Sequence, residues 1–295
     1  MTITIGVLAL QGAFLEHLNL LKRAAGQLKS QGFEDTFDFT EVRNVQQLER
    51  CDALIIPGGE STTMSLVAAQ SGLLEPLREF VKYANPGSNH GIWNGKTDLF
   101  AFRVDRKPTW GTCAGLILLS ESANATKKGG QDLIGGLDVR VNRNHFGRQV
   151  ESFQAGLDLP FLNPKDSPSN EPFPGIFIRA PVVEKILPNL DGIQEGERAK
   201  AETVVAPSKP AKDDQAQRAR SSHVDIMGVL PGRLKKAAGM GAEVNADEEA
   251  GDIIAVKQGN VFGTSFHPEL TPDIRIHVWW LKQVSEAVAT KTATC

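Results

Sequence analysis

Residues 108–119, Pro-Thr-Trp-Gly-Thr-Cys-Ala-Gly-Leu-Ile-Leu-Leu, constrain the fold more than any other stretch of the chain. The pattern predicts a strand that enters a tight turn at Cys113 and leaves as a helix, with Gly111 and Gly115 two residues to either side. This is the layout of a nucleophile elbow with cysteine in place of serine, and the amides that open the helix favour the reactive thiolate. A buried, unreactive cysteine at a strand end explains the same stretch equally well, so the rest of the chain must decide.

Composition limits the class of protein. Of the 295 residues, 41% are hydrophobic and 23% are charged, which is ordinary for a globular chain of one or two domains. The net charge of -3 gives no electrostatic reason to expect a nucleic acid or an anionic membrane as partner. Cys51, Cys113 and Cys295 form no disulfide pattern, and the sequence shows neither a membrane-spanning run nor a signal peptide. We therefore expect a cytoplasmic protein.

The order of apolar and polar segments predicts an α/β fold. Strands are predicted at residues 2–10, 37–42, 53–56 and 108–112, and helices at 14–28, 45–50, 61–71 and 73–83. The second half is richer in strands, predicted at 137–141, 150–157, 175–179, 182–186, 226–230, 253–257 and 261–266, and closes with a helix at 273–288. Alternating strands and helices indicate a largely parallel sheet. We expect one domain over residues 1–295, with irregular surface insertions at about 85–106 and 195–252.

Several predicted strands end in residues that suit a binding site. Gln11, the pair Gly58 and Gly59, and Cys113 each follow a buried strand. Because ligands bind beyond the carboxyl ends of parallel strands, these residues should face one cleft. The paired glycines expose backbone amides that can stabilise an oxyanion, and Ser61 is expected to cap the next helix. An ordinary strand-to-helix turn is the alternative.

His267 and Glu269 are the groups that a thiol nucleophile needs. In extended backbone, residues two apart project to the same side, and Pro268 between them favours that geometry. The imidazole can take the proton of a thiol and return it to a leaving amine, while the carboxylate orients the ring. A strand-end histidine beside a solvated glutamate is the alternative without a function.

A metal site is a further interpretation of the same pair, because a His-x-Glu pair can open a site of two histidines and one carboxylate. Such a site needs another well-placed histidine. The remaining ones, His17, His90, His145, His223 and His277, show no ligand spacing. We therefore predict neither a metal nor another cofactor.

Six segments resemble one family in their order along the chain. They are residues 6–12 (GVLALQG), 57–64 (PGGESTTM), 111–116 (GTCAGL), 143–149 (RNHFGRQ), 177–181 (FIRAP) and 265–270 (SFHPEL). Together they resemble the class I glutamine amidotransferases, and within them the glutaminase subunits of pyridoxal 5'-phosphate synthase, the enzyme of vitamin B6 biosynthesis. The resemblance implies a three-layer, flavodoxin-like fold with a mostly parallel central sheet. It also implies hydrolysis of L-glutamine to L-glutamate and ammonia, and a partner, the separate synthase subunit that receives the ammonia.

The resemblance implies roles for individual residues. Cys113 matches the nucleophile of the family, His267 its general base and Glu269 the third member of the triad. The backbone amides of Gly59 and Ala114 match the oxyanion donors. The positions that match glutamine contacts are Gly59, Glu60, Ser61, Arg143, Ile178 and Arg179. Without the family, we would interpret the two arginines as surface residues of strands.

Two other functions stay open. A triad hydrolase of the same fold that acts on γ-glutamyl peptides would use the same three residues. A non-catalytic docking or regulatory subunit would keep the fold, although the complete set of Cys, His and Glu argues against it.

Overall fold

The structure is a computed structural model that describes residues 1–82, 107–124, 131–143, 152–162, 171–188, 196–197, 203–207, 223–230 and 252–292. The helices are α1 (Phe14–Ser30), α2 (Val45–Glu49), α3 (Ser61–Gln70), α4 (Leu74–Lys82), α5 (Ala114–Leu119) and α9 (Arg275–Thr292). Two short 3-10 helices are η1 (Pro160–Leu162) and η4 (Pro268–Leu270). The strands are β1 (Thr2–Leu8), β2 (Thr36–Val42), β3 (Ala53–Ile56), β4 (Thr109–Thr112), β5 (Ser120–Asn124), β6 (Leu137–Asn142), β7 (Ser152–Leu157), β8 (Phe173–Ile178), β9 (Val182–Ile186), β10 (Thr203–Val205), β11 (Asp225–Leu230), β12 (Asp252–Gln258) and β13 (Val261–Thr264).

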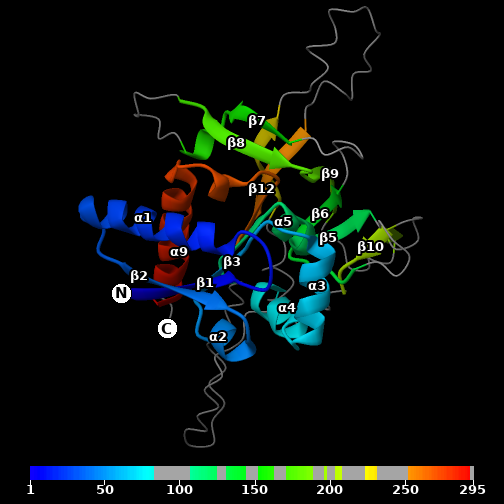
Figure 1. The fold of residues 1–295 in the computed structure, drawn as a ribbon, viewed down its shortest axis with the longest axis horizontal. Coiled ribbons are helices and arrows are strands. Elements are labelled where there is room, and N and C mark those ends of the chain that lie inside the picture. The colour runs from blue at the N-terminus through cyan, green and yellow to red at the C-terminus, as the bar shows by residue number, and fades with distance from the viewer. Residues whose placement is uncertain are drawn as a thin grey trace, which may run out of the picture.

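Among the described residues, eleven strands form one sheet in the order β10-β5-β6-β9-β12-β13-β4-β3-β1-β2, with β11 paired to β12. The five neighbours β2, β1, β3, β4 and β13 are all parallel. Beyond them, β12, β6 and β5 run opposite to the other strands of the sheet. A separate antiparallel pair, β7 and β8, lies beside the sheet (Figure 1). The prediction of an α/β fold with a large, mostly parallel central sheet is confirmed.

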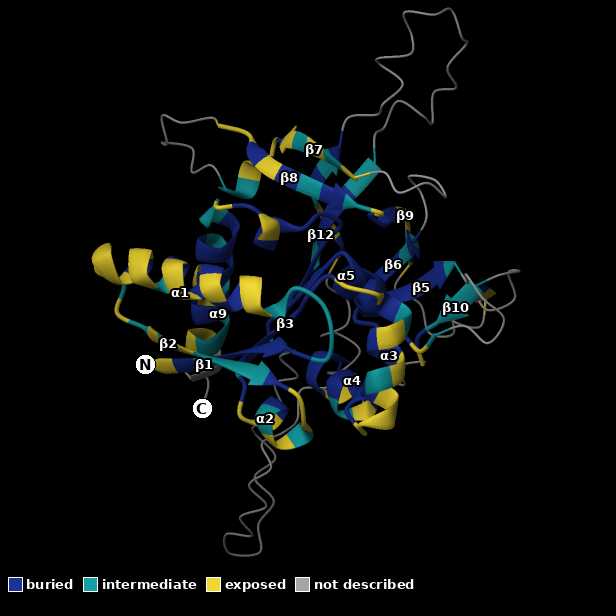
Figure 2. Ribbon diagram, in the orientation of Figure 1, coloured by how far each residue is buried: buried dark blue, intermediate teal, exposed yellow. Residues whose placement is uncertain are grey.

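The sheet divides the hydrophobic core in two, and the alternation of side chains along its strands explains why. Ile55 points to the face covered by α1 and α9, whereas its neighbours Leu54 and Ile56 point to the face covered by α3, α4 and α5. Strand β2 at the edge of the sheet is mostly half-buried, whereas β3 is buried on both faces, as its dark colour in Figure 2 shows. Burial stabilises each such side chain by about 1.5–3 kcal/mol. The result is three layers: helix, sheet and helix.

The structure departs from the predicted elements at a few positions. Glu60, and not Ser61, caps α3, because its longer side chain reaches the amides of Thr62 and Thr63. Strand β5 was not predicted, since its sequence Ser-Glu-Ser-Ala-Asn has little strand propensity and follows α5 directly. Strand β10 was not predicted; it falls inside the second predicted insertion and belongs to the main sheet, as does β11, which matches the strand predicted at 226–230. The first, residues 85–106, lies outside the described residues.

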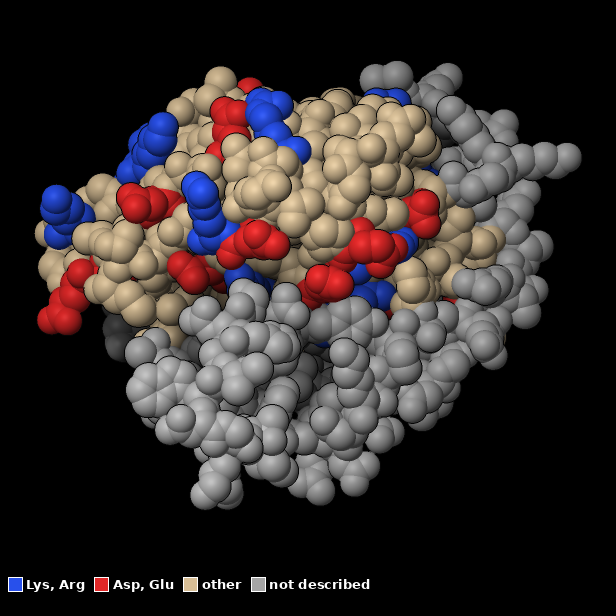
Figure 3. All heavy atoms as spheres, turned by 90° about the horizontal axis from the view of Figure 1, so that it is seen from below, with Lys and Arg blue, Asp and Glu red and all other residues tan. Residues whose placement is uncertain are grey.

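The described surface carries charges of both signs. On the face shown in Figure 3, acidic and basic side chains lie intermixed among uncharged atoms. None of the described helices is long and apolar enough to cross a membrane.

Candidate active site

The backbone at Cys113 is strained. Its φ of 48° and ψ of -101° lie outside the regions that side-chain-bearing residues favour, which costs about 1–3 kcal/mol. Two hydrogen bonds hold the turn: the amide of Cys113 donates to the carbonyl of Thr264 (2.8 Å), and its carbonyl accepts from the amide of Ile117 (3.2 Å). The elbow thus fixes the thiol between the end of β4 and the start of α5.

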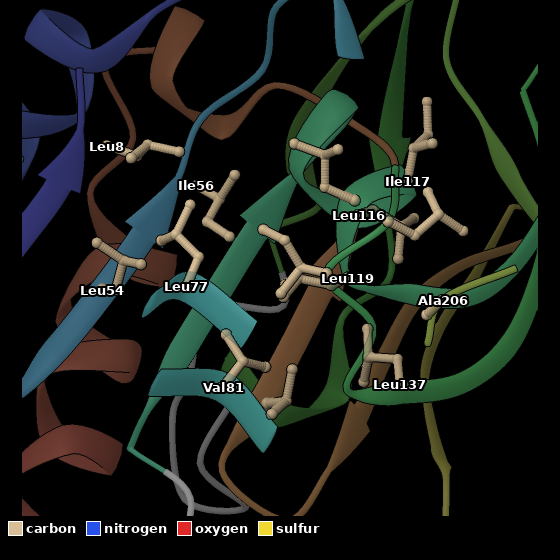
Figure 4. Packing of buried hydrophobic residues seen from close by; sticks show 14 of the residues in the cluster. Leu8, Leu54, Ile56, Leu77, Val81, Leu116, Ile117, Leu119, Leu137 and Ala206 are labelled. Carbon is tan, nitrogen blue, oxygen red and sulfur yellow. The ribbon is translucent and has the colours of Figure 1, made fainter. Parts of the chain in front are cut away.

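Close packing behind the elbow requires glycine at position 115. A Cβ atom on Gly115 would lie 2.0 Å from the carbonyl oxygen of Ile56, so only glycine lets α5 approach the end of β3 this closely. Figure 4 shows Leu116 and Leu119 of α5 directed into the same core as Ile56 and Leu77. Because the helix is anchored by its apolar side chains, the strain at the turn is balanced by burial.

His267 and Glu269 meet through a turn and not through extended backbone. Pro268 opens the 3-10 turn η4, so the predicted extended geometry is wrong, yet Nδ1 of His267 lies 2.7 Å from Oε1 of Glu269. The amide of His267 also donates to the carbonyl of Ile176 in β8 (2.8 Å). A Cβ on Gly58 would lie 2.3 Å from Cε1 of the imidazole. Gly58 after β3 therefore packs closely against the ring, and β8 holds the backbone of His267.

The electrostatics of this group favour a charged imidazole. Burial lowers the pKa of His267, but hydrogen bonds with Cys113 and Glu269, and the negative charge of each, outweigh it and raise that pKa to about 10. All three side chains are buried, with exposed fractions of 6% for Cys113, 7% for His267 and 4% for Glu269. Their attraction is therefore little screened by water. An imidazolium between thiolate and carboxylate is the arrangement that covalent acyl transfer requires.

The start of α3 forms the opposite side of the site. Both carboxylate oxygens of Glu60 accept backbone hydrogen bonds, from Thr62 at 3.0 Å and Thr63 at 2.6 Å. Burial raises the pKa of Glu60, but these bonds and one from the hydroxyl of Thr63 lower it to about 2. The amide of Glu60 donates to Oε1 of Gln11 (2.8 Å), which ties the turn after β1 to the turn after β3. The carboxylate of Glu60 is thus a fixed anion at the helix start.

Arg143 reaches the same helix start from the end of β6. Its Nη2 donates to the hydroxyls of Ser61 (3.0 Å) and Thr62 (3.1 Å). Those two hydroxyls donate in turn to Oε1 of Gln131, each at 3.1 Å. Burial lowers the pKa of Arg143, and the negative charge of Glu60 opposes this shift. Among the described residues no carboxylate binds this guanidinium directly, and a buried guanidinium of that kind is suited to receive one from a ligand.

The other predicted site residues lie at neighbouring strand ends. Gly59 follows β3, and a Cβ there would lie 2.4 Å from Oε1 of Gln11. Ala114 is buried at the first position of α5. Ile178 ends β8 half-buried, and Arg179 follows it, exposed and with a φ of 45°. The structure thus places Gly59 and Ala114 after the neighbouring strands β3 and β4 of the main sheet, and Ile178 and Arg179 at the end of β8 in the separate pair of strands.

Comparison with known proteins identifies the family. A family model described as the SNO glutamine amidotransferase family matches residues 7–93, 94–211 and 232–286. The chain belongs to this family. A solved structure titled "Crystal structure of glutamine amidotransferase" is 30% identical, with a TM-score of 0.55, over 95% of this chain and 98% of that one.

Curated relatives of this amidotransferase share a name. Probable pyridoxal 5'-phosphate synthase subunit PDX2 of Arabidopsis thaliana is 38% identical over 96% of this chain and 86% of the relative. Pyridoxal 5'-phosphate synthase subunit PdxT of Thermococcus onnurineus is 34% identical over 95% of this chain and 98% of the relative. Probable pyridoxal 5'-phosphate synthase subunit SNO3 of Saccharomyces cerevisiae is 35% identical over 96% of both.

The amidotransferase site includes two histidines that their spacing in the sequence did not reveal. His17 in α1 lies 3.4 Å from Glu269 and 3.1 Å from His277 in α9. The available signal was that His17 falls on the apolar face of a helix, beside Leu18 and Leu21. In the part of the chain that the structure describes, no group of three or more histidine, cysteine or acidic residues is arranged to hold a metal ion. His90 and His145 lie outside the described residues.

Proposed function

We propose that this chain hydrolyses L-glutamine to L-glutamate and ammonia, with Cys113 as nucleophile, His267 as acid and base, and Glu269 as the carboxylate that orients the imidazole. One observation carries the proposal: a strained cysteine elbow, a buried imidazole and a buried carboxylate make contact at the ends of adjacent strands of the sheet. The description of the family as glutamine amidotransferases supports glutamine as the substrate, and the names of the curated relatives, subunits of pyridoxal 5'-phosphate synthase, support a role in pyridoxal 5'-phosphate synthesis.

The reaction begins when the sulfur of Cys113 forms a bond to the amide carbon of the glutamine side chain, and the carbonyl electron pair moves onto oxygen. The amides of Gly59 and Ala114 stabilise this oxyanion. His267 then gives its proton to the amide nitrogen as the C–N bond breaks, which releases ammonia and leaves a glutamyl thioester. The neutral imidazole next takes a proton from water, the water oxygen attacks the thioester, and glutamate leaves as the thiolate re-forms.

Recognition of a free amino acid requires groups for both of its charged ends. The Arg143 guanidinium and the hydroxyls beside it suit the carboxylate of glutamine. The carboxylate of Glu60, kept ionised by its pKa of about 2, suits the ammonium. Ile178 and Arg179, at the end of β8, complete the proposed contacts.

The ammonia has a destination in this proposal. We infer a separate synthase subunit as partner, which receives the ammonia and incorporates it into pyridoxal 5'-phosphate. Weak activity of the free chain and a clear gain on addition of the synthase are expected. A cytoplasmic location belongs to the same proposal.

Ammonia release from glutamine, measured with and without the synthase, tests the function. Cys113→Ala should abolish the release in both conditions. Cys51→Ala is the matched control, because Cys51 is the other buried free cysteine of the described chain and its sulfur instead donates to the carbonyl of Gln47. Activity that survives Cys113→Ala, or that is greater with a γ-glutamyl peptide than with glutamine, would contradict the proposal.

A further inference from the structure

The outer oxygen of Glu269 faces a histidine and not water. Oε1 is occupied by His267, whereas Oε2 is buried and has no hydrogen bond of good geometry among the described residues. Nε2 of His17 lies 3.4 Å from it. A buried carboxylate oxygen needs a donor, because its charge is otherwise left without solvation.

The surroundings of His17 decide which of its nitrogens carries the proton. Nε2 lies between Oε2 of Glu269 and the hydroxyl of Thr112, at 3.4 and 3.3 Å, while Nδ1 lies 3.1 Å from Nε2 of His277. With the proton on Nδ1, the lone pair of Nε2 would face a carboxylate oxygen and be repelled. With the proton on Nε2, His17 donates toward the carboxylate and accepts from His277.

His277 fits the second arrangement. Its Nδ1 is buried without a hydrogen-bond partner among the described residues, so a proton there would be an unpaired buried donor. The proton therefore belongs on Nε2, where it is donated to His17. Burial lowers the pKa of both rings, to about 3 for His277, and so both are neutral.

Aromatic contacts with Trp110 hold both rings in place. Trp110 lies edge-on to His17 and His277, with ring centroids 5.5 and 5.1 Å away. Its own Nε1 donates to Thr264 in β13 (3.2 Å). His17 and His277 are fully buried, so neither can exchange its partner for water.

We propose that His17 is a positioning residue for the triad: its Nε2–H, fixed by His277 and shared with the hydroxyl of Thr112, attracts Oε2 of Glu269 electrostatically and thereby keeps Oε1 on Nδ1 of His267. This inference rests on the proposed function of the triad. It adds a donor group to the triad, since among the described residues only Oε1 of the carboxylate has a hydrogen-bond partner. His17 and His277 come from opposite ends of the chain, so packing of α1 against α9 becomes a condition for catalysis.

A pair of variants of equal shape tests the proposal in the full chain with the synthase. Gln in place of His17 keeps an N–H that can reach Oε2, whereas Met has nearly the same shape and no donor. We expect His17→Met to lower kcat for ammonia release by about tenfold with KM changed by less than about twofold. His17→Gln should restore kcat to within about threefold of the unchanged chain.

Two controls separate this effect from loss of fold. Leu21→Ala, on the same buried face of α1 but without contact to Glu269, should lower the melting temperature while kcat per folded molecule stays unchanged. The His277→Gln and His277→Met pair should repeat the contrast at about threefold, and it decides the question if His17→Met does not fold.

A spectroscopic readout is independent of turnover. The proton between Nδ1 of His267 and Glu269 should give a far-downfield proton resonance that His17→Gln keeps and His17→Met shifts or loses. Equal kcat for the folded Gln and Met variants, or an unchanged resonance in both, would overturn the inference. The proposed function is tested separately, by the loss of activity in Cys113→Ala and by the preference for glutamine over a γ-glutamyl peptide.

Discussion

The two sides of the candidate site are built in different ways. On the reacting side, Cys113, His267 and Glu269 are buried and are held by backbone hydrogen bonds and the core behind α5. On the recognition side, side-chain hydrogen bonds connect Arg143 to the start of α3, where Glu60 is exposed. A reacting side held by the backbone and a recognition side held by side chains predict that changes on the first lower kcat and changes on the second raise KM.

The largest effect is expected from adding a side chain at Gly115, behind the elbow, where close packing leaves no room for one. Gly115→Ala places a methyl group against the Ile56 carbonyl, so the free energy of unfolding should fall by about 3 kcal/mol or more. Gly26→Ala is the matched control, because Gly26 lies within α1 with open space around it, and it should gain about 0.5–1 kcal/mol. Urea unfolding followed by circular dichroism measures both. Equal stabilities of the two variants would show that the elbow is not rigidly packed.

A change on the recognition side should affect binding and leave the chemistry intact. Arg143→Met removes a buried guanidinium that donates to Ser61 and Thr62, so KM for glutamine should rise about 10–100-fold with kcat nearly unchanged. Arg140→Met, three residues earlier on β6, serves as control because its partners include Glu184 and Glu197, away from α3. A fall in kcat at constant KM for Arg143→Met would remove the distinction between the two sides.

Coupling within the reacting side can be read from one titration. His267 has a pKa raised to about 10, so its ring should stay protonated through neutral pH and lose its proton only as the pH approaches that value. Cys113→Ala removes one of the two hydrogen bonds and one of the two negative charges, so the pKa of His267 should fall. NMR of histidine-labelled protein measures the shift, with Cys51→Ala as the unshifted control. An identical titration in all three proteins would mean that thiol and imidazole do not interact.

The smallest expected effect tests whether the hydroxyl of Thr62 contributes to glutamine binding separately from Arg143. Thr62→Val removes one of the two hydroxyls that accept from Arg143 and leaves Ser61 in place, so KM should rise only about threefold. Because Thr62 is expected to act through Arg143, the double variant Thr62→Val with Arg143→Met should match Arg143→Met alone. Additive changes in KM would instead assign Thr62 a contact of its own with the substrate.

Local chemistry explains which parts of the site could be predicted. The elbow at Cys113 was predictable because small residues at fixed offsets are a short-range requirement of the turn. The pairing of His267 with Glu269 was predictable from their spacing. The backbone conformation between them was not, because a 3-10 turn can also bring two side chains that are two residues apart together when other elements hold the histidine in place. Both results concern contacts between residues close in sequence.

Contacts between residues far apart in the sequence could not be predicted from the sequence. His17 and His277 are 260 positions apart, and each looked like an isolated histidine on a helix until the packing of α1 on α9 joined them. The cap of α3 was missed for another reason: Ser61 has the shorter and more typical capping side chain, but Glu60 precedes it and reaches both amides. The parallel core of the sheet was predicted, because β3 is wholly apolar and buried on both faces and β1 is nearly so.

The central claim is that Cys113 attacks the amide carbon of glutamine, and trapping the thioester tests it most directly. The chain and the synthase are mixed with isotope-labelled glutamine, quenched in acid within one turnover, digested and analysed by mass spectrometry. If Cys113 is the nucleophile, one labelled glutamyl group is expected on the peptide that contains Cys113, and none on that peptide in Cys113→Ala. Ammonia release without any label on Cys113, or a label on Cys51 instead, would contradict it.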